Sequence, residues 1–115
     1  MLHLIKKLEE QYKKTINEFN KDDWKRISQY QELSEDFIRE YQNKVDWYKI
    51  SMFQNLSEDF IREYQNKVDW WCMFQYQKLS EKFIREFQRD ILLGSMSRYQ
   101  KLGDALFEAI TKKCR

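Results

Sequence analysis

The chain is poor in the residues that interrupt regular structure. In 115 residues it has no proline and only two glycines, Gly94 and Gly103. An all-β protein needs such residues every few positions to make its turns. Their scarcity excludes a β-sandwich or a β-barrel and predicts an all-α fold. Charged residues make up 35% of the chain, which is too many for a membrane span, so no membrane partner is expected.

Histidine and cysteine are also scarce. His3 is the only histidine, so the chain can assemble neither a catalytic triad nor a histidine metal site. Cys72 and Cys114 form no metal-binding motif and are expected to be reduced thiols in a cytosolic protein. The N-terminal segment becomes charged after a few residues, unlike a secretory signal. We therefore expect an intracellular (cytoplasmic) protein that is not an enzyme, with no catalytic residue, cofactor or metal site.

What the chain does contain is a tandem repeat. The segment LSEDFIREYQNKVDW occurs unchanged at 33–47 and at 56–70, a step of 23 residues. The same step aligns Trp24, Trp47 and Trp70 with Leu93. Repeats of this length are typical of solenoids. The sequence predicts a single domain, a short α-solenoid of helical hairpins, with an N-terminal capping helix at 1–23 and repeats at 24–46, 47–69, 70–92 and 93–115, the last a degenerate cap.

Each repeat contains the signals of two short helices. Asp46 and Ser57 are suitable N-caps, and acidic residues follow Ser57 where the helix dipole favours them. Asn66 is expected to adopt the left-handed conformation that ends the second helix. Helices of roughly 8–12 residues cannot stand alone, so the hairpins must stack. The residues expected to face the core are Trp47, Ile50, Phe53 and Gln54 in the first helix and Phe60, Ile61, Tyr64 and Val68 in the second.

The first 23 residues lack this pattern. Their apolar residues follow one face of a single longer helix, which we expect to cover the first hairpin. An atypical unit at each end is what a stacked array needs, because its outermost faces meet water. The residues on the expected face are Leu4, Ile5, Leu8, Tyr12, Ile16 and Phe19.

Three sets of polar residues recur with the repeat. Serine followed by glutamate, as in Ser57-Glu58, is interpreted as a helix cap, because a hydrolytic site would not be repeated. Arginine followed by glutamate, as in Arg62-Glu63, predicts a solvated helix face, inter-repeat ion pairs or a ladder facing a partner. The glutamine column either hydrogen-bonds the interhelical turn or reads nucleic-acid bases. This column consists of Gln31, Gln54, Gln77 and Gln100.

The pattern W-x-x-I-S-x-x-Q-x-L-S-E-x-F-I-R-E-[YF] begins at Trp24, returns at Trp47 and returns with losses at Trp70, where Met73 and Phe74 replace Ile-Ser. It resembles the short tandem repeats of uncharacterised proteins from giant viruses, phages and some bacteria. The resemblance covers about four fifths of the chain. It implies a helical array of mobile-element origin, and it implies no activity.

The favoured function is a non-catalytic macromolecular-interaction module that docks on a protein partner. Positions that vary between otherwise matched repeats are candidates for the contact surface, and large aromatic side chains are favoured at interfaces. These positions predict an apolar patch that either binds the partner or packs against a neighbouring helix or a second copy of the chain. The patch consists of Tyr48, Met52, Trp71 and Phe74.

Two alternatives remain. A nucleic acid or ribonucleoprotein could bind the basic C-terminal repeats, for example if the chain were a phage or viral inhibitor of a nucleic-acid-guided defence nuclease. The chain could instead be a structural homo-oligomer. Steep salt dependence would indicate nucleic acid. The basic residues concerned are Arg98, Lys101, Lys112, Lys113 and Arg115.

Overall fold

The computed structural model describes residues 1–98 of the chain, with side chains described as far as Gly94. Every regular element in residues 1–98 is helical, which confirms the all-α prediction. The elements, in chain order, are α1 (Leu2–Tyr12), the 3-10 helix η1 (Ile16–Glu18), α2 (Lys21–Tyr30), α3 (Glu35–Glu40), α4 (Trp47–Phe53), α5 (Glu58–Glu63), α6 (Trp70–Tyr76), α7 (Glu81–Glu86) and α8 (Gln88–Arg98).

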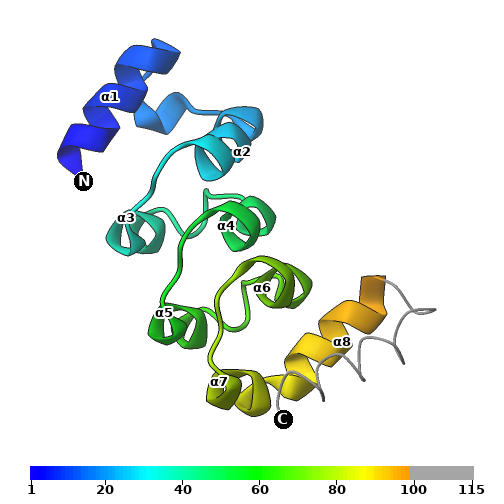
Figure 1. Cartoon of the computed structure of the whole chain (residues 1–115). Coiled ribbons are helices and arrows are strands. Elements are labelled where there is room, and N and C mark those ends of the chain that lie inside the picture. The colour runs from blue at the N-terminus through cyan, green and yellow to red at the C-terminus, as the bar shows by residue number, and fades with distance from the viewer. Residues whose placement is uncertain (99–115) are drawn as a thin grey trace.

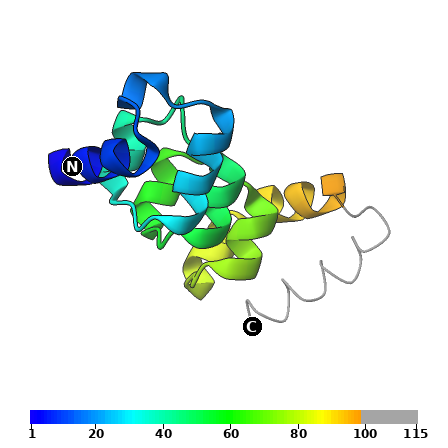
Figure 2. The same cartoon turned by 90° about the horizontal axis from the view of Figure 1, so that it is seen from above.

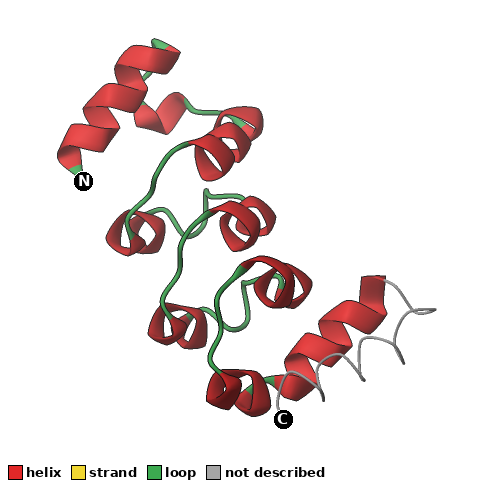
Figure 3. Ribbon diagram, in the orientation of Figure 1, coloured by secondary structure: helices red, strands yellow, loops and turns green. Residues whose placement is uncertain are grey.

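The helices are arranged in two rows (Figure 1). In one row α2, α4, α6 and α8 pack directly against one another in that order. In the other row α3, α5 and α7 follow one another. Seen from above, the successive hairpins lie over one another, with α1 and α8 extending on opposite sides (Figure 2). Because short loops make every connection, each hairpin lies next to the hairpin that follows it in the sequence (Figure 3).

Side-chain caps start the short helices where the sequence predicts. The Asp46 carboxylate accepts a hydrogen bond from the Lys49 backbone N–H and begins α4, and Asp69 does the same for α6. The hydroxyls of three serines accept from the backbone N–H three residues later and begin α3, α5 and α7. Such caps satisfy N–H groups that have no partner inside the helix. The three serines are Ser34, Ser57 and Ser80.

Three aromatic rings form the centre of each hairpin. The Trp47 ring centroid lies 6.3 Å from that of Phe60 and 5.2 Å from that of Tyr64. The Trp47 indole N–H also donates to the Gln42 carbonyl at 2.9 Å, so the polar edge of the ring is satisfied. The repeat builds the same cluster three times within the described part of the chain: Trp24 with Phe37 and Tyr41, Trp47 with Phe60 and Tyr64, and Trp70 with Phe83 and Phe87.

The prediction of one long N-terminal helix is wrong. α1 ends at Tyr12, and Lys13 adopts a left-handed conformation with φ of 55°. The Glu9 side chain then accepts the Ile16 backbone N–H at 2.7 Å, which stabilises the turn. Residues Thr15 and Glu18 form a capping box that begins η1. The apolar residues beyond the turn still face the core, so the periodicity was informative although the helix is interrupted.

The hairpin turns also differ from the prediction. Asn66 is not left-handed, since Lys13 is the only non-glycine residue of the described part with positive φ. Instead the Tyr64 carbonyl accepts from the N–H groups of Lys67 and Val68, at 2.8 and 3.1 Å. This right-handed turn replaces the last turn of the expected helix. The helices are therefore shorter than predicted, with 6 residues in α5 and 7 in α4.

The regular pattern changes at α8. Leu92 stands where Asp46 and Asp69 cap earlier repeats, and α8 begins at Gln88 rather than after that position. Because residue 92 is not an aspartate N-cap, no local signal sets the start of α8 at that position, and the helix can begin earlier. α8 passes close to the start of α6, where a Cβ at Gly94 would lie 3.0 Å from the Trp70 Cβ. Glycine therefore fits this close approach without displacing α6.

Candidate interaction surface

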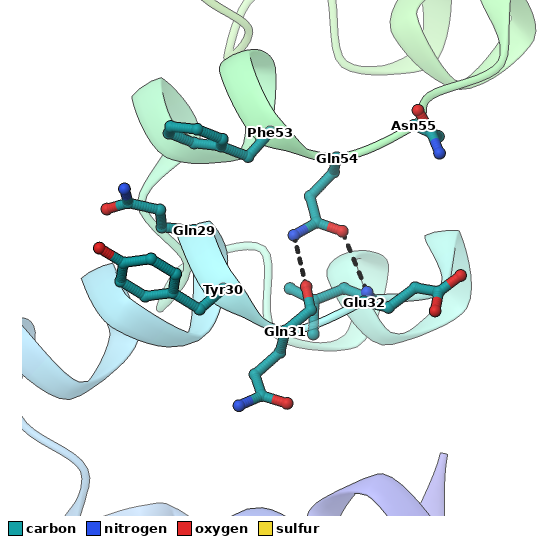
Figure 4. Close-up of a pocket in the computed structure, with 8 residues that line it drawn as sticks. Gln29, Tyr30, Gln31, Glu32, Phe53, Gln54 and Asn55 are labelled. Atoms are coloured by element: carbon teal, nitrogen blue, oxygen red, sulfur yellow. Dashed lines mark hydrogen bonds between the residues drawn. The ribbon is translucent and has the colours of Figure 1, made fainter.

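The recurring glutamine follows the first helix of a repeat and hydrogen-bonds the backbone of the preceding hairpin. Gln54 is only 5% exposed. Its amide nitrogen donates to the Gln31 carbonyl at 2.7 Å, and its amide oxygen accepts the Leu33 N–H at 3.0 Å (Figure 4). The same nitrogen also donates to the Ser28 carbonyl at 2.8 Å. The interpretation of Gln54 as a buried side chain that hydrogen-bonds the interhelical turn is confirmed. The side chain satisfies three backbone groups that no helix can pair.

We call this set of three hydrogen bonds the Gln54 clamp, and an equivalent set is made one repeat later. Gln77 donates to the carbonyls of Ser51 and Gln54, at 2.9 and 2.8 Å, and accepts the Leu56 N–H at 3.4 Å. Gln31 has no preceding repeat, and it donates instead to Gln11 of α1 at 3.3 Å. Gln100 lies outside the described residues. In Gln54 and Gln77 the carboxamide is fully used within the fold, so neither is free to read a ligand.

The serine and glutamate pairs also have structural roles. Serine caps its own helix, as predicted. Glutamate contacts the next repeat: Glu35 accepts from the Ser57 backbone N–H at 2.7 Å and from its hydroxyl at 3.1 Å. Glu58 binds Ser80 in the same way, at 2.6 and 3.0 Å. This second role was not predicted, and only its recurrence in the sequence could have suggested it.

The arginine and glutamate pairs form inter-repeat ion pairs, which is one of the predicted outcomes. Arg39 contacts Glu63 and Arg62 contacts Glu86, each at 3.0 Å. The Arg39 guanidinium also lies 5.2 Å from the centre of the Phe60 ring in the next repeat. Hydrogen bonding by Arg39 lowers the pKa of the Glu63 carboxyl below its ordinary value of 4.5. Arg62 lowers the pKa of the Glu86 carboxyl in the same way.

Among the large apolar side chains that are exposed in the repeats, one column is aromatic and is exposed in three successive units. Tyr30, Phe53 and Tyr76 end α2, α4 and α6, and they are 74%, 46% and 57% exposed. We call these three residues the aromatic row. The prediction that Phe53 faces the core is wrong. Successive helix residues are rotated by about 100°, so a residue six positions after Trp47 lies about 120° away from it on the helix surface.

A surface pocket lies beside the aromatic row at each of two repeat junctions. The first has a volume of about 360 Å³ and is lined by Tyr30 and Phe53 together with the Gln54 clamp. Figure 4 shows that Gln29, Tyr30 and Phe53 lie on one side of the Gln54 carboxamide. The second, of about 310 Å³, lies one repeat further on and is lined by Tyr76 and Gln77. The repeat thus places equivalent pockets side by side.

The charges around these pockets change along the array. Glu32 lines the first pocket, Lys78 lines the second, and Asn55 lines both. These three residues occupy one column of the repeat, and all three are exposed. Beside the rings, the Lys49 ammonium lies 5.7 Å from the centre of Phe53. The lining of the first pocket therefore carries a negative charge at Glu32, with Lys49 near its Phe53 ring, and the lining of the second carries a positive charge at Lys78.

The structure places the predicted contact residues on two neighbouring helices, Tyr48 and Met52 on α4 and Trp71 and Phe74 on α6. Tyr48 is 37% exposed on α4, and Met52 is half-buried on the same helix. Trp71 is half-buried on α6, in the column of Tyr48. Phe74 packs against the core in the column of the buried Ser28 and Ser51. Of the predicted basic residues, the side chain of Arg98 and all of Lys101, Lys112, Lys113 and Arg115 lie outside the described residues.

Within residues 1–98 no group of His, Cys, Asp and Glu side chains could hold a metal ion. In the same part of the chain, each helix is too short or too polar to cross a membrane. Cys72 is buried. Comparison of the chain with family models, with curated proteins and with solved structures gives no match.

Proposed function

We propose that this protein is a non-catalytic interaction module that binds a protein partner through the aromatic row. The observation that carries the proposal is the exposure of Tyr30, Phe53 and Tyr76 at the same position of consecutive repeats. Tyrosine and phenylalanine are enriched where proteins bind one another, and large rings supply much of the binding energy. The pockets beside the rings provide the concave sites into which a partner's side chains fit.

The other recurring side chains make contacts within the fold, which leaves the aromatic row as a candidate binding surface. The glutamine, serine, glutamate and arginine columns all bind neighbouring repeats. The rings of Tyr30 and Tyr76 are not needed for such contacts, because more than half of each residue's surface is open to solvent. Tyr48 and Met52 also lie on α4, about 140° and 100° around the helix axis from Phe53, so the sequence-predicted patch is a separate candidate surface beside the aromatic row.

Site-specific photo-crosslinking tests this proposal. Benzoylphenylalanine is introduced in place of Phe53 or Tyr76, and the purified protein is irradiated in an extract of its source cells, with and without prior nuclease treatment. As a matched control the same group replaces Asp59, whose side chain is 96% exposed on α5. We expect discrete protein adducts at positions 53 and 76 and none at 59.

Two results would contradict the proposal. Adducts that disappear after nuclease treatment would indicate nucleic acid or a ribonucleoprotein, such as the target of a phage or viral inhibitor. Adducts formed only with a second copy of the chain would indicate a structural homo-oligomer. Mass spectrometry of the adducts distinguishes these outcomes.

A further inference from the structure

The spacing of the aromatic row restricts the conformation of a bound peptide. Because α2, α4 and α6 pack directly against one another, equivalent side chains follow at the usual distance between packed helices, about 8–10 Å. A polyproline II helix rises about 3.1 Å per residue and has three residues per turn, so every third residue returns to the same face after about 9.3 Å. This period matches the distance between neighbouring repeats.

Other peptide conformations fit this surface less well. An extended strand places same-face residues about 6.6 Å apart, so it falls out of register by the second pocket. An α-helix can match the spacing with residues seven positions apart, which lie about 10.5 Å from one another. However, its backbone groups are already hydrogen-bonded within the helix, whereas the carbonyls of polyproline II are open to partners.

Hydrogen-bond donors for such carbonyls border the pockets. Gln29 and Asn55 line the first pocket, and the described structure gives neither side chain a hydrogen bond. The Gln54 side chain, which also lines this pocket, is already fixed by its three hydrogen bonds to the preceding hairpin. This part of the pocket therefore does not have to reorganise when a peptide binds. Aromatic rings next to free donors are the usual means by which proteins recognise proline-rich segments.

The charged residues at the two pockets favour one direction of a bound peptide. A peptide that follows both pockets passes Glu32 at one end and Lys78 at the other. A basic residue on the peptide is favoured beside Glu32, and an acidic residue is favoured beside Lys78. Because this polarity comes from two exposed side chains, it can be reversed without changing the core.

From these four observations we infer that the aromatic row binds a proline-rich segment in the polyproline II conformation. Every third residue of the segment lies in a junction pocket, the carboxamides of Gln29 and Asn55 bind its carbonyls, and Glu32 and Lys78 set its direction. This inference rests on the proposed function, since it identifies the chemistry of the partner at the same surface.

Fluorescence anisotropy with labelled peptides tests the inference. The probes are capped oligoprolines of about seven residues, whose ends lie about 19 Å apart, with lysine at one end and glutamate at the other, in both orders, together with an alanine-rich peptide of the same length and end charges. We expect the full-length protein to bind the oligoprolines and to prefer one order of end charges. Phe53→Ser should weaken binding at least about tenfold, because a central ring is lost. Leu2→Ser removes an apolar side chain from α1 that is even more exposed, 67% against 46% for Phe53, and should change nothing.

The charge reversal gives the sharpest test. In the double variant Glu32→Lys/Lys78→Glu the preferred order of end charges should invert. Equal binding of the alanine-rich peptide, no binding of either oligoproline, an unchanged affinity in Phe53→Ser, or a preference that does not invert would each overturn the inference. Tighter, salt-sensitive binding of an oligouridine would assign the surface to nucleic acid instead. The proposed function is judged separately, by the crosslinks at positions 53 and 76.

Discussion

At the scale of single residues, Gln54 shows how one side chain joins two hairpins. The turn between α2 and α3 exposes two carbonyls and an N–H group that cannot pair within either helix. Gln54 binds all three from the next repeat. A buried backbone group without a partner costs about 1–3 kcal/mol, which makes this position more sensitive than its polar side chain suggests.

Gln54→Ala should therefore lower the free energy of unfolding by about 2–4 kcal/mol, as measured by urea denaturation. Gln75→Ala is the matched control, because Gln75 is exposed on α6, and it should change stability by less than about 0.5 kcal/mol. Equal effects of the two substitutions would show that the clamp does not contribute to stability.

At the same scale, the serine caps differ in their surroundings. Aspartate is ordinarily as good an N-cap as serine. At position 57, however, the hydroxyl and the backbone N–H both bind the Glu35 carboxylate of the preceding repeat. The Ser34 hydroxyl caps α3 by accepting the Phe37 backbone N–H, and among the described residues it contacts no carboxylate from a preceding part of the chain.

Ser57→Asp should thus be destabilising by about 1–2 kcal/mol, because it places two carboxylates against each other and removes a donor. Ser34→Asp should be tolerated within about 0.5 kcal/mol. Thermal unfolding followed by circular dichroism measures both. If the two variants were equally stable, the Glu35 contact would be unimportant for the repeat.

At the scale of elements, α8 shows how the array departs from its own pattern. It begins within the third repeat because the aspartate cap is absent, and it approaches α6 closely at Gly94. The Trp70 Cβ is attached directly to the backbone, so it cannot move away as the end of a long side chain could. A side chain at position 94 would therefore have to move α8 away from α6.

Gly94→Leu should lower stability by about 1–3 kcal/mol through overpacking. Leucine is the better helix former by almost 1 kcal/mol, so a loss of stability can only report the steric contact. The expected decrease in Tm is roughly 4–8 °C per kcal/mol for a domain of this size. An increase in Tm would show that α8 does not pack against Trp70.

At the scale of the whole molecule, charge pairs connect the second helices along their row. Arg39 and Arg62 lower the pKa of Glu63 and Glu86 in the repeats that follow. A carboxyl group whose pKa is lower in the folded than in the unfolded chain stabilises the fold above its unfolded pKa. This contribution is lost as pH falls through the folded pKa.

The fold should accordingly be stable at neutral pH and lose stability below about pH 4.5, the ordinary glutamate value from which both pKa values are lowered. The double variant Glu63→Gln/Glu86→Gln should lose less stability than the wild type between neutral and acidic pH. Urea denaturation at several pH values measures the difference. Identical pH profiles would show that these exposed pairs contribute nothing measurable, and added salt should reduce any difference.

The amino-acid sequence by itself determined the period of the array, the all-α class, and the caps at Asp46, Asp69 and the three serines. The caps depend on groups within about four residues of one another, so they are visible in any single repeat, and the period appears when one repeat is compared with the next. The sequence also identified the columns that form the aromatic clusters, because burial of large rings is the main driving force available to so short a repeat.

Only the tertiary structure decided what happens between repeats. The partners of Gln54, Glu35 and Arg39 lie more than twenty residues away, and no local pattern specifies them. The left-handed Lys13 has a nearer cause, since a side-chain contact from Glu9 to the Ile16 N–H, seven residues on, favours a turn over the continued helix that the apolar periodicity predicted. The aromatic row was misplaced for a related reason. The face of a short helix that meets solvent depends on where its neighbours stack, and stacking in this protein leaves the rings of Tyr30, Phe53 and Tyr76 uncovered.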